Sequence, residues 1–181
     1  SQTLLRVLDV TKTAMGARKL RDWILRPLAN LQEISSRHDA VEAFTRDRSL
    51  MKDLHEELTK VRDMERLLAR IVAGTGNARD VAAIGQSLAC LPGLKKLIGN
   101  NTVPLIHRLA DSVKPLPELA DLIARIIVDE PPITIKEGGI IRDGYNGQLD
   151  ELRHAASEGR SWPAEYQTKE QARTGIKTLK V

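Results

Sequence analysis

The chain has 181 residues, a length that suits one domain with an appendage and is ample for a buried core. Hydrophobic residues make up 41% and charged residues 29%, but aromatic residues only 3%, which is too few for an aromatic-walled ligand pocket or a base-stacking surface. The net charge of +4 permits contact with nucleic acid without requiring it, and a single cysteine excludes a disulfide framework within the chain.

The same composition indicates where the protein works. Cys90 lies in the apolar run 88–91, and we expect it to be a buried core residue of a protein from a reducing compartment. No signal-peptide pattern follows Ser1, and no uncharged stretch reaches the roughly 18 apolar residues that a membrane span needs. These features predict a cytoplasmic protein with no membrane partner.

Apolar residues recur at helical spacing through the first 127 residues and predict a series of helices. Thr13 is placed to cap a helix that Pro27 ends. Asn30, with Glu33 three residues later, has the spacing of a capping box at the start of the next helix. Further apolar faces predict helices around residues 50–61, 67–71, 77–92, 105–109 and 117–127.

Two of these helices carry local signals of their own. Asn77 with Asp80 predicts another capped start. We expect Pro92 to kink or end that helix, because proline lacks the N–H that an interior turn requires. Pro117 stands near a first turn, which is the helical position that best accepts proline.

The pattern changes after residue 128. Asp129-Glu-Pro-Pro132 is a helix breaker, and β-branched pairs flank Gly138-Gly139, which predicts a short hairpin or extended segment near residues 133–145. The predicted fold class is therefore all-α, an irregular helical bundle with this short segment and one long projecting helix.

The long helix is predicted for residues 146–173, with a length of about 42 Å at ~1.5 Å per residue. We expect Pro163 to bend it. Its apolar stripe is narrow, and we expect it to be exposed in the isolated chain; it consists of Leu149, Leu152, Ala156 and Trp162. Residues 174–181 predict the start of a strand, which needs a neighbour, so we expect the chain to be part of a larger protein.

No group of side chains has the spacing of a catalytic or metal site. The four histidines lie in separate segments, and His55 lacks a second histidine four residues later. Gly74-Thr-Gly76 lacks the Lys and Ser/Thr of a phosphate-binding loop, and Asp129 with Glu130 is more typical of a helix end than of an acid/base pair. We therefore expect no catalytic, cofactor-binding or metal-binding residue in this chain.

Basic residues gather at two places. Asp22 interrupts the first set, which favours a solvated helix face over a DNA-binding patch; this set is Arg18, Lys19, Arg21 and Arg26. The second set lies on the long helix and the segment after it, where cations can reach phosphates without packing constraints. These candidates for contact with the DNA backbone are Lys169, Arg173, Lys177 and Lys180.

Several short stretches follow one another in an order that covers nearly the whole chain. They are Thr3–Asp9, Thr11–Trp23, Arg26–Leu28, Arg37–Glu42, Asp63–Leu67 and Pro117–Asp121. The two most distinctive are Ile140-Ile-Arg-Asp-Gly-Tyr-Asn146 and Glu170-x-x-Arg173-Thr-Gly-Ile-Lys177-x-Leu-Lys-Val181. In this order the stretches resemble the core domain and lever of the MutS family of DNA mismatch-recognition ATPases.

The resemblance implies a helical core (connector) segment at residues 1–145, an ascending lever helix at 146–173 and the start of the mostly β clamp domain at 174–181. It implies a structural and allosteric coupling role that links the DNA-gripping clamp to distant ATPase domains. Phe44 is followed by Thr-Arg and not by the family's mismatch-probing x-Glu pattern, and the Walker A loop is absent from this sequence. Mismatch reading and ATP hydrolysis are therefore not expected of this segment, and Pro163 departs from the aliphatic residue expected after Trp162.

By the same resemblance, ATP and Mg²⁺ are cofactors of the intact parent, a DNA-dependent ATPase, and not of this segment. The parent is expected to form a homodimer, to bind mismatched double-stranded DNA and to work with a MutL-type repair partner, associated with the bacterial nucleoid when on DNA. The alternative is a helical protein–protein interaction module unrelated to DNA. Such a module shares the composition but gives no reason for the motifs at 140–146 and 173–181.

Overall fold

The computed structural model describes residues 3–175, apart from the side chains of residues 158–165. Within that range the chain is helical, with no strand beyond isolated single-residue bridges, which confirms the all-α fold class. The chain divides into two compact units, residues 1–140 and 141–181. The assignment of 1–145, 146–173 and 174–181 to core, lever and clamp stays a prediction.

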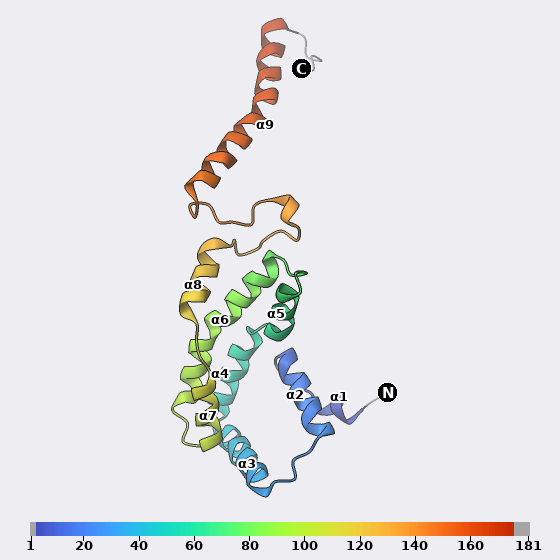
Figure 1. Ribbon diagram of the computed structural model, residues 1–181, viewed down its shortest axis with the longest axis vertical. Helices are drawn as coiled ribbons and strands as arrows, with labels where there is room; N and C mark the ends of the chain where they lie inside the picture. Colours follow the sequence, from blue (N-terminus) through green and yellow to red (C-terminus); the bar gives the residue numbers. More distant parts are fainter. Residues whose placement is uncertain (1–2, 176–181) are drawn as a thin grey trace. The chain divides into compact units, whose positions relative to one another are not determined.

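The first unit contains eight of the described α-helices and one 3-10 helix (Figure 1). Their bounds are α1 Leu4–Leu8, α2 Ala14–Leu25, α3 Leu31–Arg46, α4 Arg48–Thr59, α5 Met64–Val72, α6 Ala78–Gly99, α7 Pro104–Ser112, α8 Pro117–Ile126 and η1 Ile135–Glu137. α6 contacts α4, α5, α7 and α8, so it is the central helix of the unit.

Side chains just outside the helices start them where the sequence predicts. The Thr13 hydroxyl accepts a hydrogen bond from the Gly16 N–H at 3.0 Å and begins α2. The Asn30 carboxamide oxygen accepts hydrogen bonds from the N–H groups of Gln32 and Glu33 at the start of α3. The bond from the Asn30 side chain in the expected capping box is therefore formed. Asn77 and Asp80 make the full reciprocal box at the start of α6. These caps satisfy backbone donors that a first helical turn leaves without partners.

The core of this unit is small and aliphatic, as the scarcity of aromatic residues predicts. Its buried hydrophobic residues are Ala40, Val61, Leu67, Ala82, Leu88, Leu94, Ile106, Ala110 and Ala120. Gly85 lets α8 approach α6 closely, because an added Cβ there would lie 2.6 Å from Ile123 Cγ2. The fully buried Ser87 hydroxyl accepts from the Arg62 N–H at 3.0 Å and donates to the Ala83 carbonyl at 2.8 Å.

Pro92 does not end its helix, contrary to one of the two outcomes that we expected. α6 continues seven residues further, to Gly99. Proline removes one backbone donor, but buried Leu88 and Leu94 anchor the helix on both sides of it. α6 is also long and apolar enough, by length and composition alone, to cross a membrane. Its four helical neighbours identify it as the core helix of this unit.

The segment after α8 is irregular, so of the two predicted alternatives the hairpin is not formed. Residues 135–137 form the 3-10 helix η1 instead of a strand. Thr134 and Glu137 cap it reciprocally, with the Thr134 hydroxyl donating to Glu137 Oε1 at 2.7 Å. This is a capping-box spacing, which competes with the β-branched pattern of the same residues. The Ile140 carbonyl accepts a hydrogen bond from the Val128 N–H at 3.1 Å, so the segment folds back to the residues that follow α8.

The second unit consists of a turn followed by α9, Gly147–Thr174. Asn146 caps the helix by accepting from the Leu149 N–H at 3.0 Å, and Gly175 ends it in the left-handed region at φ 70°. The backbone stays helical through position 163. The helix therefore agrees with the predicted range to within one residue at each end, and residues 176–181, with the predicted strand, lie outside the described residues.

Candidate nucleic-acid interface

The four cations predicted to contact DNA divide between described and undescribed residues. Lys169 and Arg173 are exposed near the end of α9, whereas Lys177 and Lys180 lie outside the described residues. The structure therefore brings together two of the four, and the role of all four in DNA binding stays a prediction.

Arg173 is already paired within its own helix. Its guanidinium donates to Glu170 through Nε at 2.9 Å and through Nη2 at 2.7 Å, both to Oε2. This pairing lowers the pKa of Glu170 and raises that of Arg173. A DNA phosphate would have to compete with Glu170 for the same guanidinium donors.

Three of the four residues in the N-terminal basic set likewise lie close to acids. Arg18 of α2 donates to Asp63 through Nη1 at 2.6 Å and through Nη2 at 2.7 Å, and Nη2 also reaches Glu65 at 2.5 Å. Lys19 and Arg26 both lie near Asp22. These ion pairs favour the interpretation of a solvated helix face over that of a phosphate-binding patch.

The Arg18–Asp63 pair gives a testable pH dependence. Hydrogen bonds from Arg18 lower the pKa of Asp63 from 3.8 to about 2. A lowered folded-state pKa stabilises the folded protein above pH 3.8, and this contribution is lost as the pH falls through about 2. Asp63→Asn is therefore expected to lower the free energy of unfolding by about 1 kcal/mol at neutral pH, since the pair is partly exposed.

Urea unfolding of the wild type and the variant at several pH values measures this difference. The free energies of unfolding of the two proteins should converge as the pH falls from 4 to 2. A difference that stays the same at pH 2 would contradict a stabilising contribution from the ionised Asp63 carboxylate. Glu65→Gln is the control, because Glu65 is much more exposed than Asp63 and is expected to contribute less.

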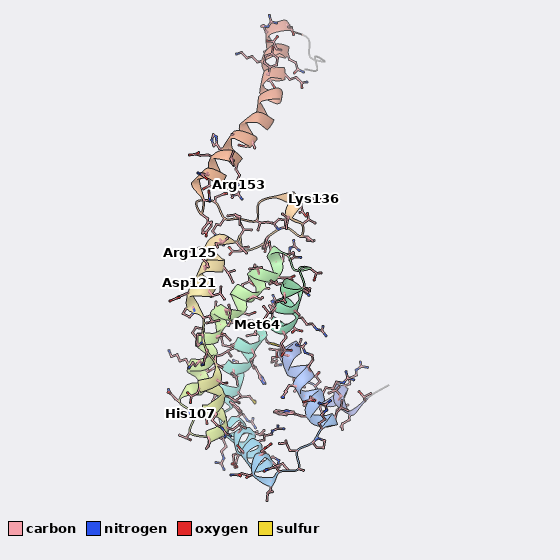
Figure 2. All side chains as sticks on the ribbon, in the orientation of Figure 1. Met64, His107, Asp121, Arg125, Lys136 and Arg153 are labelled. Atoms are coloured by element: carbon pink, nitrogen blue, oxygen red, sulfur yellow. The ribbon has the colours of Figure 1, made fainter. Side chains whose placement is uncertain are left out.

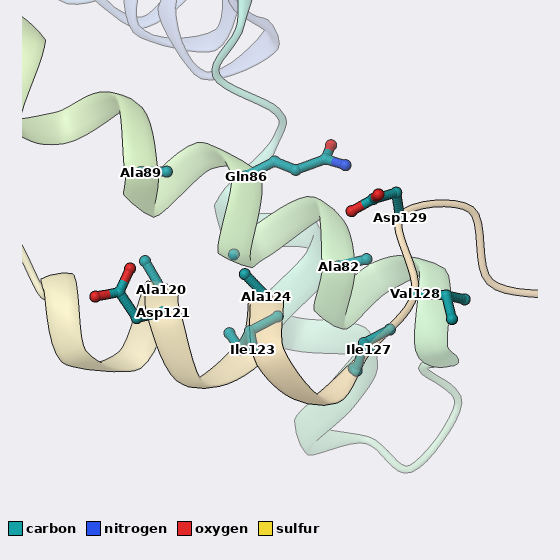
Figure 3. Close-up of a pocket in the computed structure, with 11 residues that line it drawn as sticks. Ala82, Gln86, Ala89, Ala120, Asp121, Ile123, Ala124, Ile127, Val128 and Asp129 are labelled. Carbon is teal, nitrogen blue, oxygen red and sulfur yellow. The ribbon is translucent and has the colours of Figure 1, made fainter. Parts of the chain in front are cut away.

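The groove between α6 and α8 has a volume of about 170 Å³ (Figure 3). Its lining is mainly small and aliphatic, with Gln86, Asp121 and Asp129 as the polar members. A ligand pocket needs several polar groups that converge on one point in addition to apolar walls. The close approach at Gly85 and the alanines on both helices indicate instead a helix-packing seam.

Two other sequence expectations concern reactive or metal-binding groups. Cys90 is half-buried and not fully buried as expected, and its thiol donates to the Gln86 carbonyl at 3.3 Å. The α6 face that carries it is only partly covered by neighbouring helices. Within the described residues no three or more His, Cys, Asp or Glu side chains are grouped as a metal site would require.

One polar cluster, at the start of α9, was not predicted from the sequence. Arg153 extends from the second turn of α9 (Figure 2) and donates to Asp143 Oδ1 at 2.7 Å and to the Ile141 carbonyl at 2.9 Å. Asp150 accepts from the Gly144 N–H at 2.9 Å. The spacing of Asp150 and Arg153 on one helix was a visible signal, but their bonds to the preceding turn depend on how the chain folds back.

Comparison with known proteins identifies the family. The model of MutS domain III matches residues 1–178. The DNA mismatch repair protein MutS of Methanosarcina barkeri is 46% identical over 183 residues, and the alignment covers 99% of this chain and 20% of that protein. The proteins of the same name from Halothermothrix orenii and Symbiobacterium thermophilum are 44% and 43% identical over 179 residues, with the same coverage.

The chain thus spans about a fifth of the length of the curated relatives that it matches. The match extends through both compact units and includes the distinctive stretch at 140–146. The alternative of an unrelated helical interaction module is therefore not retained, and the chain belongs to the MutS domain III family.

Proposed function

We propose that this chain is the structural and allosteric coupling segment of a larger MutS-type mismatch repair ATPase. The observation that carries the proposal is the match to MutS domain III over residues 1–178. In this proposal residues 1–145 are the connector core, 146–173 the lever helix and 174–181 the start of the clamp. The lever transmits displacement between the DNA-gripping clamp and the ATPase domains.

The properties of α9 support this role. It has 28 residues, so it extends about 42 Å, and its backbone hydrogen bonds, which lack only the donor missing at Pro163, make it stiff along its axis. Of the expected exposed stripe, Leu152 is 68% exposed and Ala156 is also exposed, whereas Leu149 is half-buried. The Trp162 side chain lies outside the described residues. In this proposal the apolar stripe of this long polar helix packs against a second lever helix, which another part of the larger protein would supply.

The chemistry of the larger protein is assigned to its other parts. ATP and Mg²⁺ would act in a separate ATPase domain, and mismatched double-stranded DNA would be read by a domain other than this one. We further propose that the parent is a cytoplasmic homodimer that works with a MutL-type partner and is associated with the nucleoid when on DNA. This segment supplies mechanical connection and, at the end of α9, cations near the DNA backbone.

Binding of duplex DNA by the 181-residue chain tests the proposed cation site. We expect weak, sequence-independent binding whose salt slope is shallow, because each phosphate contact contributes about −0.9 to the slope. Glu170→Gln is expected to strengthen binding roughly 3-fold at low salt, since it frees Arg173 from an internal competitor.

Fluorescence anisotropy with labelled duplexes, at several salt concentrations, measures both effects. The matched control is Glu151→Gln, which makes the same charge change at an exposed position near the opposite end of α9. Equal strengthening by both variants would show a general charge effect and contradict a site at Arg173. Submicromolar affinity for duplex DNA at physiological salt would contradict the view that this segment contains only part of the DNA-binding surface.

A further inference from the structure

The turn that precedes α9 is bonded to the helix by side chains and not only by the peptide chain. Arg153 donates from Nη1 to Asp143 Oδ1 and from Nη2 to the Ile141 carbonyl, at 2.7 and 2.9 Å. One turn earlier on the helix, Asp150 Oδ2 accepts from the Gly144 N–H at 2.9 Å. The helix is thus connected to three of the four residues in 141–144, all within the second unit.

The local geometry makes Arg153 difficult to replace. Its side chain is only 29% exposed, and its planar guanidinium presents two donors in a fixed fork to a carboxylate and a backbone carbonyl. Lysine has the same charge but presents a single ammonium, which cannot reproduce that fork. Gly144 has φ 82°, a conformation that strains other residues and directs its N–H to Asp150.

Asp150 depends on Arg153 as well. Its Oδ1 atom is buried and has no hydrogen-bond donor within the described part of the chain, while Arg153 Nη1 lies 3.8 Å from it. Loss of the guanidinium would leave this carboxylate partly desolvated without a nearby cation. The bond from Asp150 to the turn would then weaken together with the bonds from Arg153.

We propose that Arg153 is a positioning residue that joins the 141–144 turn and the first two turns of α9 into one rigid element. The first turn of a helix frays readily, because its N–H groups lack helical partners. Here the bonds from residues 150 and 153 oppose fraying, so a displacement of the turn is passed to the helix. The functional part of this inference, the transfer of displacement, rests on the proposed coupling role. The rigidity of the element does not depend on that role.

The test is amide hydrogen exchange of the 181-residue chain, measured by NMR for wild type and Arg153→Lys. Within residues 144–150, the hydrogen-bonded amides of Gly144, Tyr145, Leu149 and Asp150 are expected to exchange roughly 5- to 10-fold faster in the variant, because the loss of the Arg153 bonds lowers the local opening free energy. Exchange in α6 should not change. Unchanged exchange at 144–150 would overturn the proposal.

Two control variants separate the bridge from simple charge pairing. Arg173→Lys makes the same chemical change on the same helix, but Arg173 pairs locally with Glu170, so exchange at 144–150 should stay as in the wild type. Asp143→Asn removes the 91% exposed partner and leaves the bond to the Ile141 carbonyl, so it should have less than a third of the effect of Arg153→Lys. An equal effect of Asp143→Asn and Arg153→Lys would overturn the bridging role.

A second readout distinguishes failure of this inference from failure of the proposed function. In the complete polypeptide that contains this chain, Arg153→Lys is expected to weaken the effect of duplex DNA on ATP turnover while leaving basal turnover unchanged. Faster exchange without any change in the DNA effect would support the rigid element and count against the coupling function. Unchanged exchange would overturn the rigid element whatever the turnover result.

Discussion

Ile106→Ala is expected to lower the free energy of unfolding of the chain by about 2–5 kcal/mol, the largest stability effect among the substitutions considered. Ile106 is 1% exposed on α7, which packs on the central helix α6. Removing its side chain loses buried apolar surface and leaves a cavity that the small core can only partly refill. Alanine favours a helix slightly more than isoleucine, so a large loss would report packing and not helix propensity.

Urea unfolding followed by far-UV circular dichroism measures the effect. Because the chain has two compact units, the curve is first tested for more than one transition before a free energy is derived. The matched control is Leu109→Ala on the same helix, where the leucine is 53% exposed. Its expected loss is below about 1 kcal/mol, because little surface is buried there. Similar losses for the two variants would contradict the view that α7 contributes to the core through Ile106.

Asp80→Ala is expected to lower the free energy of unfolding by about 2–3 kcal/mol. Asp80 is buried at the start of α6, where its carboxylate accepts from the Asn77 N–H at 3.2 Å and from Arg70 Nε at 3.1 Å. The substitution removes an ion pair and half of a capping box together. Arg70 is half-exposed and can turn to solvent, which keeps the cost below that of a fully buried pair.

The same urea experiment at different pH values identifies the source of this loss. Hydrogen bonds from Arg70 lower the pKa of Asp80, so its contribution is present above the ordinary carboxyl range and is lost as the pH falls through the lowered value. Asp80→Asn keeps an acceptor for the Asn77 N–H but loses the charge, and its loss should be smaller than that of alanine. An equal loss for both variants would show that the cap contributes nothing measurable.

Helix starts were predictable because their interactions are local. Thr13, Asn30 and Asn77 each accept a hydrogen bond from an N–H three residues ahead, so the residue type and the spacing contain the whole interaction. The hairpin, one of the two alternatives predicted for residues 133–145, is not formed for a related reason. Thr134 and Glu137 have the same capping signal, and it prevailed over the β-branched pattern around the two glycines.

The candidate site was predictable only in part. The sequence located exposed cations near the end of α9, including Arg173, but the side-chain pairing that Glu170 imposes on it follows from rotamers that residue order does not specify. The Arg18–Asp63 pair joins residues 45 positions apart, and no local pattern predicts such a contact. The bridge at Arg153 likewise depends on the fold-back of the 141–144 turn.

The sequence by itself determined the helical class, the capped starts of three helices and, through the order of its motifs, the resemblance to the MutS family. Those features arise from interactions within one turn of helix or from residue order alone. Only the tertiary structure decided that α6 continues through Pro92, that α2 is attached to α5 through Arg18, and that Arg153 connects α9 to its preceding turn. Each of these depends on which side chains folding brings together, and periodicity along a single chain does not encode those distances.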